Sequence, residues 1–286
     1  GGWWEAVGVP VRQTDPALNH EEDTMAETPK HEAGTFCWVE LASSDQAAAR
    51  SFYSALFGWE AEEVPMSEDS AYTMFHIGGK YTAALYQADP KQPNAGPDCW
   101  GAYVAVDSVD EATERARGLG GLVLGGPFDV FDSGRMSVVQ DPAGALFYMW
   151  QAGQHHGVGL KSEHGALCWN ELLTLDTGAA ASFYKGLFGW TAHEQEMPPP
   201  TGIYTSFMLG ESPVGGMMTI QPDWGEVPPH WSTYFSVDDC DATVATAIAL
   251  GATPLMPTME IPGVGRFAGL ADPQGATFSV ITLAER

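Results

Sequence analysis

Basic residues are scarce in this sequence, and their scarcity limits the partners that the protein can have. Of its 286 residues, 12 are Lys or Arg and 37 are Asp or Glu, so the formal net charge is −25. A surface of this charge repels nucleic-acid phosphates and the anionic faces of membranes. We therefore expect no nucleic-acid partner and no membrane partner. Solubility in a high-salt or acid-adapted cell is the simplest explanation of the charge.

Long apolar runs and paired cysteines are also missing. No uninterrupted apolar stretch reaches the length of a membrane span, and Gly1–Trp4 lack the basic and apolar regions of a signal peptide. The four Cys residues show no CxxC spacing, and Cys37 and Cys168 fall on expected buried strands. These thiols are typical of a reduced protein core rather than of a disulfide framework, so we expect a cytoplasmic protein.

Sequence motifs for nucleotides and for serine hydrolysis are absent as well. The chain has no GxSxG segment, no P-loop and no GxGxxG segment after a strand. A hydrolase, an NTPase or a dinucleotide-binding enzyme therefore has no support, and no cofactor is expected.

An internal duplication dominates what is present. The segment CWVEL at Cys37–Leu41 recurs 131 residues later as CWNEL at Cys168–Leu172, and 15 of 26 positions match between residues 34–59 and 165–190. Later landmarks keep the same offset, namely Arg135 with Arg266 and Asp141 with Asp272. A repeat this long is a whole domain, not a solenoid unit.

Each copy predicts a β-α-β-β-β module followed by a fainter second one. In the first copy residues 36–41 alternate as a strand does, Asp45 stands at the N-cap of a helix over 47–57, and Gly58 ends that helix. Further strands are expected over 72–77, 83–87, 101–106, 123–124, 135–140 and 146–151, with a second helix over 109–119. The expected fold class is α+β, with four βαβββ modules paired into two domains.

The duplication also sets the expected domain boundaries. Residues 1–33 lie outside it and contain an acidic run and several turn residues, so we expect a poorly ordered leader there. The first domain is expected over 34–152, a linker over 153–164 and the second domain over 165–286.

These motifs resemble the vicinal oxygen chelate superfamily, which contains glyoxalase I, the extradiol dioxygenases, and the fosfomycin- and bleomycin-resistance proteins. The resemblance rests on Asp45 with the block ending FYSALFGW at Trp59, on Gly134-Arg135 followed by DPAG at Asp141, and on their second copies. It covers residues 34 to about 284 and is strongest to tandem glyoxalase-type proteins of actinobacteria, which are often labelled hydroxylase, some of them in polyketide-antibiotic pathways. It implies glyoxalase-like domains whose curved mixed sheets each enclose one ligand cavity, and no particular reaction.

The resemblance implies a metal site, but the ligand residues are missing. The inherited ligand positions fall on Trp38, Gly101, Tyr148, Trp169, Ser232 and Ser279. None is His, Glu, Asp or Cys, whereas a divalent ion needs about three such donors. We therefore expect no metal. The other possible donors are His76, His155, His156, His164 and His230, of which the three in the linker are expected to be solvated.

Strand parity with those positions predicts an aromatic cavity with one carboxylate in each domain. The first cavity is expected to be lined by Phe36, Trp38, Glu40, Tyr103, Leu146, Tyr148 and Trp150. The second is expected to be lined by Leu167, Trp169, Glu171, Ser232, Tyr234, Thr277 and Ser279. Such walls suit flat aromatic ligands, because ring stacking adds roughly 0.5–1.5 kcal/mol per pair beyond burial.

Three of these residues are candidates for catalysis. Glu40 and Glu171 would act as general acid or base if burial raises their pKa, or would only accept a Trp, Tyr or backbone hydrogen bond. Tyr148 could donate to a quinone or ketone oxygen, or only pack. Trp38 and Trp169 are candidates for ligand contact or for core packing alone.

Two arginines are further candidates for ligand binding. Arg135 and Arg266 occupy equivalent places, and each would either bind an anionic ligand or clamp its own hairpin.

Three functions remain open at this point. The first is a metal-independent tailoring enzyme of secondary metabolism, of lyase, isomerase or hydroxylase type, acting on an aromatic polyketide. The second is a non-catalytic protein that sequesters such a compound, as in antibiotic resistance of the bleomycin-resistance type. The third is a scaffold without a ligand. The expected partner is an aromatic small molecule, bound by a monomer or a homodimer.

Overall fold

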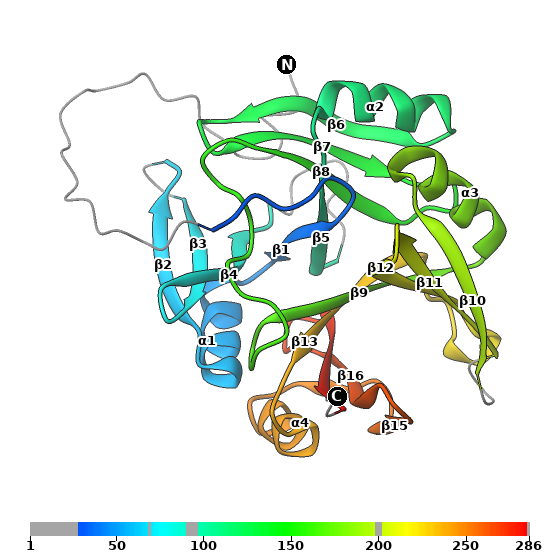
Figure 1. The fold of residues 1–286 in the computed structure, drawn as a ribbon. Helices are drawn as coiled ribbons and strands as arrows, with labels where there is room; N and C mark the ends of the chain where they lie inside the picture. The colour runs from blue at the N-terminus through cyan, green and yellow to red at the C-terminus, as the bar shows by residue number, and fades with distance from the viewer. Residues whose placement is uncertain (1–27, 68–69, 90–96, 198–201, 285–286) are drawn as a thin grey trace.

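The chain forms two mixed sheets that repeat one strand order. The computed structural model describes residues 28–67, 70–89, 97–197 and 202–284. The first sheet runs β2-β3-β4-β1-β5-β8-β7-β6, and the second runs β10-β11-β12-β9-β13-β17-β16-β14 with β15 paired to β16 (Figure 1). In each sheet the first strand of the copy pairs in parallel on one side and antiparallel on the other. The expected α+β class with paired modules is confirmed.

The strands of the first sheet are β1 (Phe36–Ser43), β2 (Glu60–Pro65), β3 (Ala71–Ile77), β4 (Lys80–Gln87), β5 (Cys99–Ala105), β6 (Leu122–Val130), β7 (Gly134–Gln140) and β8 (Leu146–Ala152). Those of the second are β9 (Leu167–Thr174), β10 (Thr191–Met197), β11 (Gly202–Leu209), β12 (Ser212–Thr219), β13 (His230–Ser236), β14 (Thr253–Pro254), β15 (Met259–Ile261), β16 (Gly265–Ala271) and β17 (Thr277–Leu283). The helices are α1 (Gln46–Phe57), α2 (Val109–Gly118), α3 (Thr177–Phe188) and α4 (Cys240–Ala249), with a short 3-10 turn at Pro222–Trp224.

Helices α1 and α3 begin and end on the residues that the sequence indicates. The Asp45 carboxylate accepts the backbone N–H of Ala48 at 3.0 Å, which satisfies one of the free donors of the first turn. Gly58 closes α1 with φ +70°, a conformation that costs a glycine little. Asp176 and Gly189 play the same parts in α3.

Each of these two helices packs against the sheet of the other domain. Tyr53 of α1 lies 5.4 Å from Phe278 of β17, and Tyr184 of α3 lies 5.5 Å from Phe147 of β8, measured between ring centroids. Figure 1 shows the corresponding arrangement, with α1 beside α4 and α2 beside α3. The two hydrophobic cores therefore each contain residues from both domains.

Two tryptophans that end the helix motifs also hydrogen-bond across the domains. The Trp59 indole N–H donates to the Gly165 carbonyl at 2.9 Å, and the Trp190 indole N–H donates to the Gly34 carbonyl at 2.7 Å. Both bonds are buried, so they fix the start of each domain to the other.

A bulge near the start of the first strand of each copy overturns two parity predictions. The register between β1 and β5 shifts between Phe36 and Trp38, and the register between β13 and β9 shifts beside Leu167. Phe36 consequently packs on Trp190 and Trp231 of the other domain, at 5.8 and 5.0 Å. Leu167 is buried in the core that contains Phe57. Because a bulge inserts one unpaired residue, neither side chain faces the cavity expected for it.

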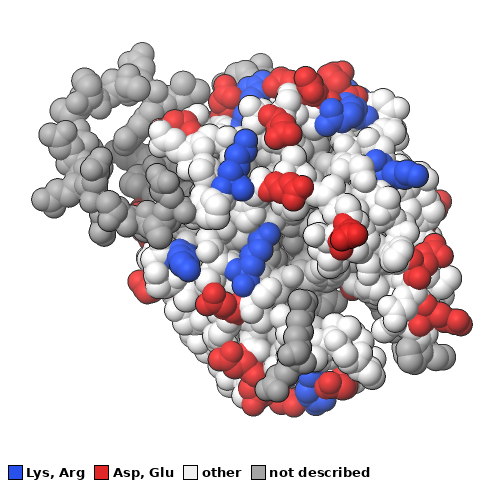
Figure 2. All heavy atoms as spheres, viewed as in Figure 1, with Lys and Arg blue, Asp and Glu red and all other residues white. Residues whose placement is uncertain are grey.

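The surface carries the acidic bias of the sequence. On the face drawn in Figure 2, Asp and Glu side chains are scattered with isolated Lys and Arg residues between them, and no extended basic patch appears. Within the part of the chain that the structure describes, no helix is both long enough and apolar enough to cross a bilayer.

Candidate functional site

The centre of the first candidate site is the Glu40 carboxylate on β1. Its backbone pairs with Ala84 of β4 and Gly101 of β5, and these small residues leave the space above the strand to larger neighbours. Tyr103 donates its hydroxyl to Oε1 of Glu40 at 2.7 Å, and Tyr72 donates its hydroxyl to Oε2. The carboxylate is thus held between two phenols and remains partly exposed.

The second domain repeats this arrangement around Glu171. The register places Glu171 opposite Gly216 and Ser232. Tyr234 donates to Oε1 of Glu171 at 3.0 Å, and Tyr204 supplies the second hydrogen bond. Glu171 is more enclosed than Glu40, with 7% of its surface exposed.

A tryptophan extends each network by one step. The Trp169 indole N–H donates to the Tyr204 hydroxyl at 3.0 Å. Trp38 makes the equivalent hydrogen bond to Tyr72. The indole in the inherited ligand position is therefore a donor that orients the phenol on the carboxylate, and each domain contains a Trp–Tyr–Glu–Tyr network.

Burial sets the acid–base character of these networks. It raises the pKa of Glu40 and of Glu171 because a desolvated carboxylate loses stability as an ion, and the two tyrosine hydrogen bonds oppose part of that rise. Burial, reinforced by the adjacent carboxylate charge, raises the pKa of Tyr72, Tyr103 and Tyr234 well above the usual value. These phenols consequently stay protonated as donors.

Tyr148 lies directly over the first network. Its Cε2 atom is 2.4 Å from where a Cβ on Gly101 would stand, so its ring rests on the β5 backbone. The ring stacks on Tyr103 with centroids 4.4 Å apart and planes 11° apart, and its hydroxyl shares a hydrogen bond with Tyr86 of β4. The structure thus brings the predicted Tyr148, Tyr103 and Glu40 together.

The linker covers the same domain more closely than the sequence indicates. The His155 ring packs edge-on against Trp38 at 4.5 Å, and its carbonyl accepts the Trp150 indole N–H at 2.9 Å. Burial lowers the His155 pKa to about 4, and Nδ1 of His156 hydrogen-bonds the Thr28 carbonyl. The expectation of solvated linker histidines is therefore wrong for His155 and His156, whereas His164 is exposed.

Arg135 and Arg266 lie on the opposite face of their sheets from the networks. Arg135 pairs in register with Gln151, whereas its neighbour Met136 pairs with Trp150 on the network face. The guanidinium of Arg135 grips Asp110 at the start of α2 with two bonds of 2.8 and 3.0 Å.

Arg266 grips Asp241 of α4 in the same way, at 2.8 and 2.9 Å. The two arginines therefore clamp a helix to a hairpin, and the structure does not bring them to the ligand positions predicted for them.

The inherited metal positions do not fit a metal ion. Trp38 and Trp169 donate N–H groups there, and the Tyr148 ring covers Gly101. Ser279 shares a hydrogen bond with Tyr234. Each site has one carboxylate, Glu40 or Glu171, where a divalent ion needs about three carboxylate, imidazole or thiolate donors. Across the described ranges, no three His, Cys, Asp or Glu residues come close enough to hold a metal.

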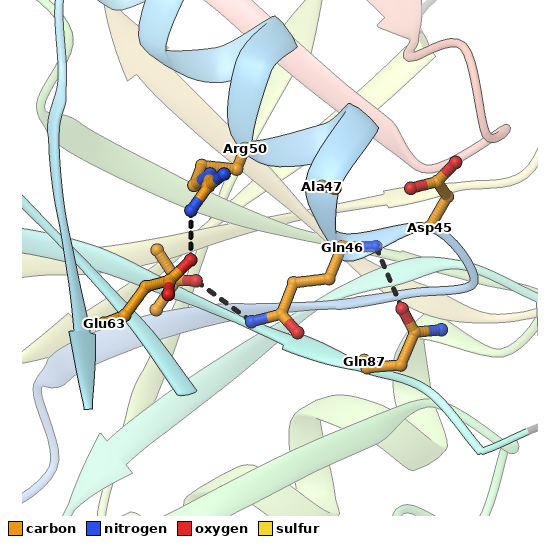
Figure 3. Close-up of a pocket in the computed structure, with 7 residues that line it drawn as sticks. Asp45, Gln46, Ala47, Arg50, Glu63 and Gln87 are labelled. Atoms are coloured by element: carbon orange, nitrogen blue, oxygen red, sulfur yellow. Dashed lines mark hydrogen bonds and ion pairs between the residues drawn. The ribbon is translucent and has the colours of Figure 1, made fainter. Parts of the chain in front are cut away.

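A separate polar hollow lies at the start of α1. It has a volume of about 220 Å³ and is lined by residues that already bind one another, as Figure 3 shows. Arg50 pairs with Glu63, and the Gln46 side chain donates to Thr73 at 2.9 Å. The Gln46 backbone N–H donates to Gln87 at 3.1 Å, and these mutual contacts do not indicate a ligand.

Tyr72 and Tyr204 are site residues that the sequence pattern does not single out. Tyr72 falls within an expected strand, and the offset between the two tyrosines is 132 rather than 131, so the duplication does not align them. Their equivalence follows from register, since Tyr72 pairs with Tyr86 and Tyr204 with Met218 in matching ladders. A search for tyrosines at strand positions near the offset would have found them.

Two mixed-sheet domains with a shared strand order, each centred on its first strand, define a protein with a tandem glyoxalase-type fold. The Glyoxalase/Bleomycin resistance protein/Dioxygenase superfamily model matches residues 35–149, and a Glyoxalase-like domain model matches residues 168–281. The chain belongs to this glyoxalase superfamily.

Two similar proteins align with most of the chain. The candidate glyoxylase CFP32 of Mycobacterium bovis is 41% identical over 258 residues, which is 90% of this chain and 98% of that protein. The anthracycline biosynthesis protein DnrV of Streptomyces peucetius is 38% identical over 267 residues, covering 88% of this chain and 94% of that protein.

Solved structures support the fold at low sequence identity. A Mn(II)-bound glyoxalase from Novosphingobium aromaticivorans superposes with a TM-score of 0.61 at 15% identity, over 88% of this chain and 83% of that one. An extradiol ring-cleaving dioxygenase from B. fuscum superposes with a TM-score of 0.59 at 14% identity, over 91% and 75%. At such identities the likeness concerns the fold alone.

Proposed function

We propose that the protein acts on an aromatic small molecule of polyketide type in secondary metabolism, without a metal, and uses Glu40 or Glu171 as general acid or base. The observation that carries the proposal is the carboxylate held between two protonated phenols in both domains. The relationship to an anthracycline biosynthesis protein supports an aromatic polyketide as the ligand class. We place this activity in the cytoplasm, in a monomer or a homodimer.

The chemistry follows from the environment of the carboxylate. Because burial raises the pKa of Glu40 and Glu171, each carboxyl group moves toward the range in which it can take or give a proton near neutral pH. The paired phenols fix its orientation and stay protonated, because each keeps its one O–H on the carboxylate. The half-buried rings of Tyr72, Tyr148 and Trp169 provide faces for a planar ligand.

Metal independence rests on the donor chemistry of the inherited positions. Indole N–H groups, a phenol ring and serine hydroxyls stand where a divalent ion would need carboxylates or imidazoles. The proton transfer proposed for the glutamates requires no Lewis acid. Elemental analysis should find no stoichiometric Zn, Ni, Mn or Fe. About one chelator-removable metal per domain, lost together with ligand binding, would contradict this part.

A panel of planar aromatic polyketides, including a tetracyclic anthraquinone, tests the proposal. The full chain is titrated with each compound by calorimetry, and each mixture is then analysed by liquid chromatography and mass spectrometry with and without chelator. We expect at least one compound to bind and to be converted equally in both conditions. Absence of binding across the panel would overturn the proposal.

One observation favours a second function, binding without catalysis. The carboxylate and both phenols of each network satisfy one another, and the raised pKa values of the phenols leave no ready nucleophile among them. A protein that only sequesters its ligand would bind a compound of the panel and return it unchanged.

A further inference from the structure

We propose that the site of the first domain accepts an organic cation, an ammonium group carried on an aromatic ligand, with Glu40 as its counter-charge, and that the site of the second domain does not. This inference rests on the proposed function and specifies the ligand class of one of its two sites. It concerns Glu40 and the tyrosine cluster, which we define as Tyr72, Tyr86, Tyr103 and Tyr148.

Glu40 has hydrogen bonds but no cationic partner. Among the residues that the structure describes, its contacts are the neutral hydroxyls of Tyr72 and Tyr103, and none of the ion pairs includes it. A carboxylate has about four acceptor positions, so two remain after the tyrosine bonds. Glu40 is also partly exposed, whereas its counterpart Glu171 is buried.

The tyrosine cluster gathers around this carboxylate, with two hydroxyls bound to it and a stacked ring pair beside it. Tyr148 lies parallel to Tyr103 at 4.4 Å and is tied to Tyr86 by a hydrogen bond. The negative charge of Glu40 acts on every member of the cluster and, after burial, contributes to the raised pKa of each phenol. Aromatic faces attract ammonium groups through their quadrupoles, and a carboxylate adds direct charge attraction.

The second domain keeps the Trp–Tyr–Glu–Tyr network but has no tyrosines equivalent to Tyr86 and Tyr148. The strand registers make Met218 the counterpart of Tyr86 and Ser279 the counterpart of Tyr148. Glu171 is also more enclosed than Glu40. A cation would therefore meet fewer tyrosines and a less accessible carboxylate there.

The net negative charge of the whole chain also favours binding of a cation. A net charge of −25 raises the local concentration of cations and speeds their encounter with the protein. Selectivity between the two domains must still come from the sites, because both share this field.

A pair of isosteric probes tests the inference. The full chain is titrated by calorimetry with 3-hydroxyphenyltrimethylammonium and with 3-tert-butylphenol, which has the same shape and no charge. We expect the cation to bind about tenfold or more tightly than the neutral probe. Glu40→Gln should abolish that preference and leave the affinity for 3-tert-butylphenol within about twofold, because the amide keeps the size of the side chain and removes its negative charge.

The duplication supplies the controls. Glu171→Gln removes the equivalent carboxylate, and Glu111→Gln removes one negative charge from an exposed helix, so both should keep the preference for the cation. The double change Tyr86→Met with Tyr148→Ser converts the first site to the residues of the second and should also abolish the preference. Circular dichroism checks that each variant is folded.

Three results would overturn the inference. Equal affinity of the wild-type chain for both probes would remove the role of charge, and binding of a neutral polyketide in the panel would then still support the proposed function. Loss of the preference in Glu171→Gln but not in Glu40→Gln would show that the cation binds in the second domain and not in the first. Retention of the preference in both the Glu40→Gln and the double variant would show that the cation binds elsewhere.

Discussion

The Tyr53 hydroxyl donates to the Asp272 carboxylate at 3.0 Å across 219 positions of sequence. It also accepts the Trp100 indole N–H at 3.0 Å, so a tryptophan and a helix of the first domain are tied to a hairpin of the second. The other Asp272 oxygen accepts backbone N–H groups of that hairpin. Tyr184, Trp231 and Asp141 form the reciprocal connection. The motifs that carry the family resemblance thus also join the two domains.

Tyr53→Phe should therefore destabilise the whole chain. It leaves a buried carboxylate oxygen and a buried indole N–H without their partner, which costs about 1–3 kcal/mol. Tyr184→Phe should cost a similar amount because its network is equivalent. Urea unfolding measures both, with Ser51→Ala on the exposed side of α1 as the control. If neither Phe variant differs from that control, the interdomain bonds do not contribute to stability.

Substituting Arg135 distinguishes a structural ion pair with Asp110 from a contact with the ligand. Arg135→Lys keeps the charge but loses the two-bond grip on Asp110, so the melting temperature should fall slightly. Affinity for the aromatic panel should not change, because Arg135 lies on the other face of the sheet from Tyr148. A weaker ligand affinity with an unchanged melting temperature would instead support the ligand contact predicted from the sequence.

The sequence predicts the fold well because the duplication provides an internal comparison. Helix caps at Asp45 and Gly58 and the strand character of β1 are local signals, and the structure confirms them. The sequence predicts only residues 123–124 of strand β6, because Gly125-Gly126-Pro127 is typical of a loop. In the structure these residues form bulges within a longer strand.

The site is predicted only in part, because its remaining contacts are tertiary. Parity places Glu40 and Tyr103 on one face, since both lie beyond the bulge. It fails for Phe36, which precedes the bulge. The Tyr72 hydrogen bond and the docking of His155 on Trp38 depend on how a hairpin and a linker fold back, and no periodic pattern carries that information.

The two glutamates should make stability depend on pH. Their folded-state pKa lies above the ordinary value of 4.5, so between these values the folded chain binds more protons than the unfolded chain. Their contribution to stability therefore falls as pH rises from about 4.5 through the folded pKa. Urea unfolding of the wild type and of the double Gln variant at both ends of this window should show a difference that favours the wild type more at low pH. A pH-independent difference would contradict the raised pKa values.

Gly101→Ala should disturb the first site alone. The added Cβ would stand 2.4 Å from Cε2 of Tyr148, so the ring must move off Tyr103. We expect a change in the near-ultraviolet circular dichroism and a weaker affinity for 3-hydroxyphenyltrimethylammonium. Ser232→Ala is the matched change in the second domain and introduces no new atom to displace a ring. Identical spectra for the wild type and Gly101→Ala would show that Tyr148 is not fixed as described.

Replacing each glutamate by glutamine distinguishes an enzyme from a binding protein. Gln keeps nearly the same shape and still accepts a tyrosine hydrogen bond, but it cannot exchange a proton. If Glu40 or Glu171 is the general acid or base, one of the two variants should lose turnover of the converted polyketide by roughly 10²-fold or more. Ligand affinity and unfolding should change much less, because the packing of the Trp–Tyr–Glu–Tyr network is retained. In a binding protein there is no turnover to lose, and the affinity of Glu40→Gln for a cationic ligand should change instead. If both variants keep full function and only melt at lower temperature, the two carboxylates serve the structure and the catalytic proposal fails.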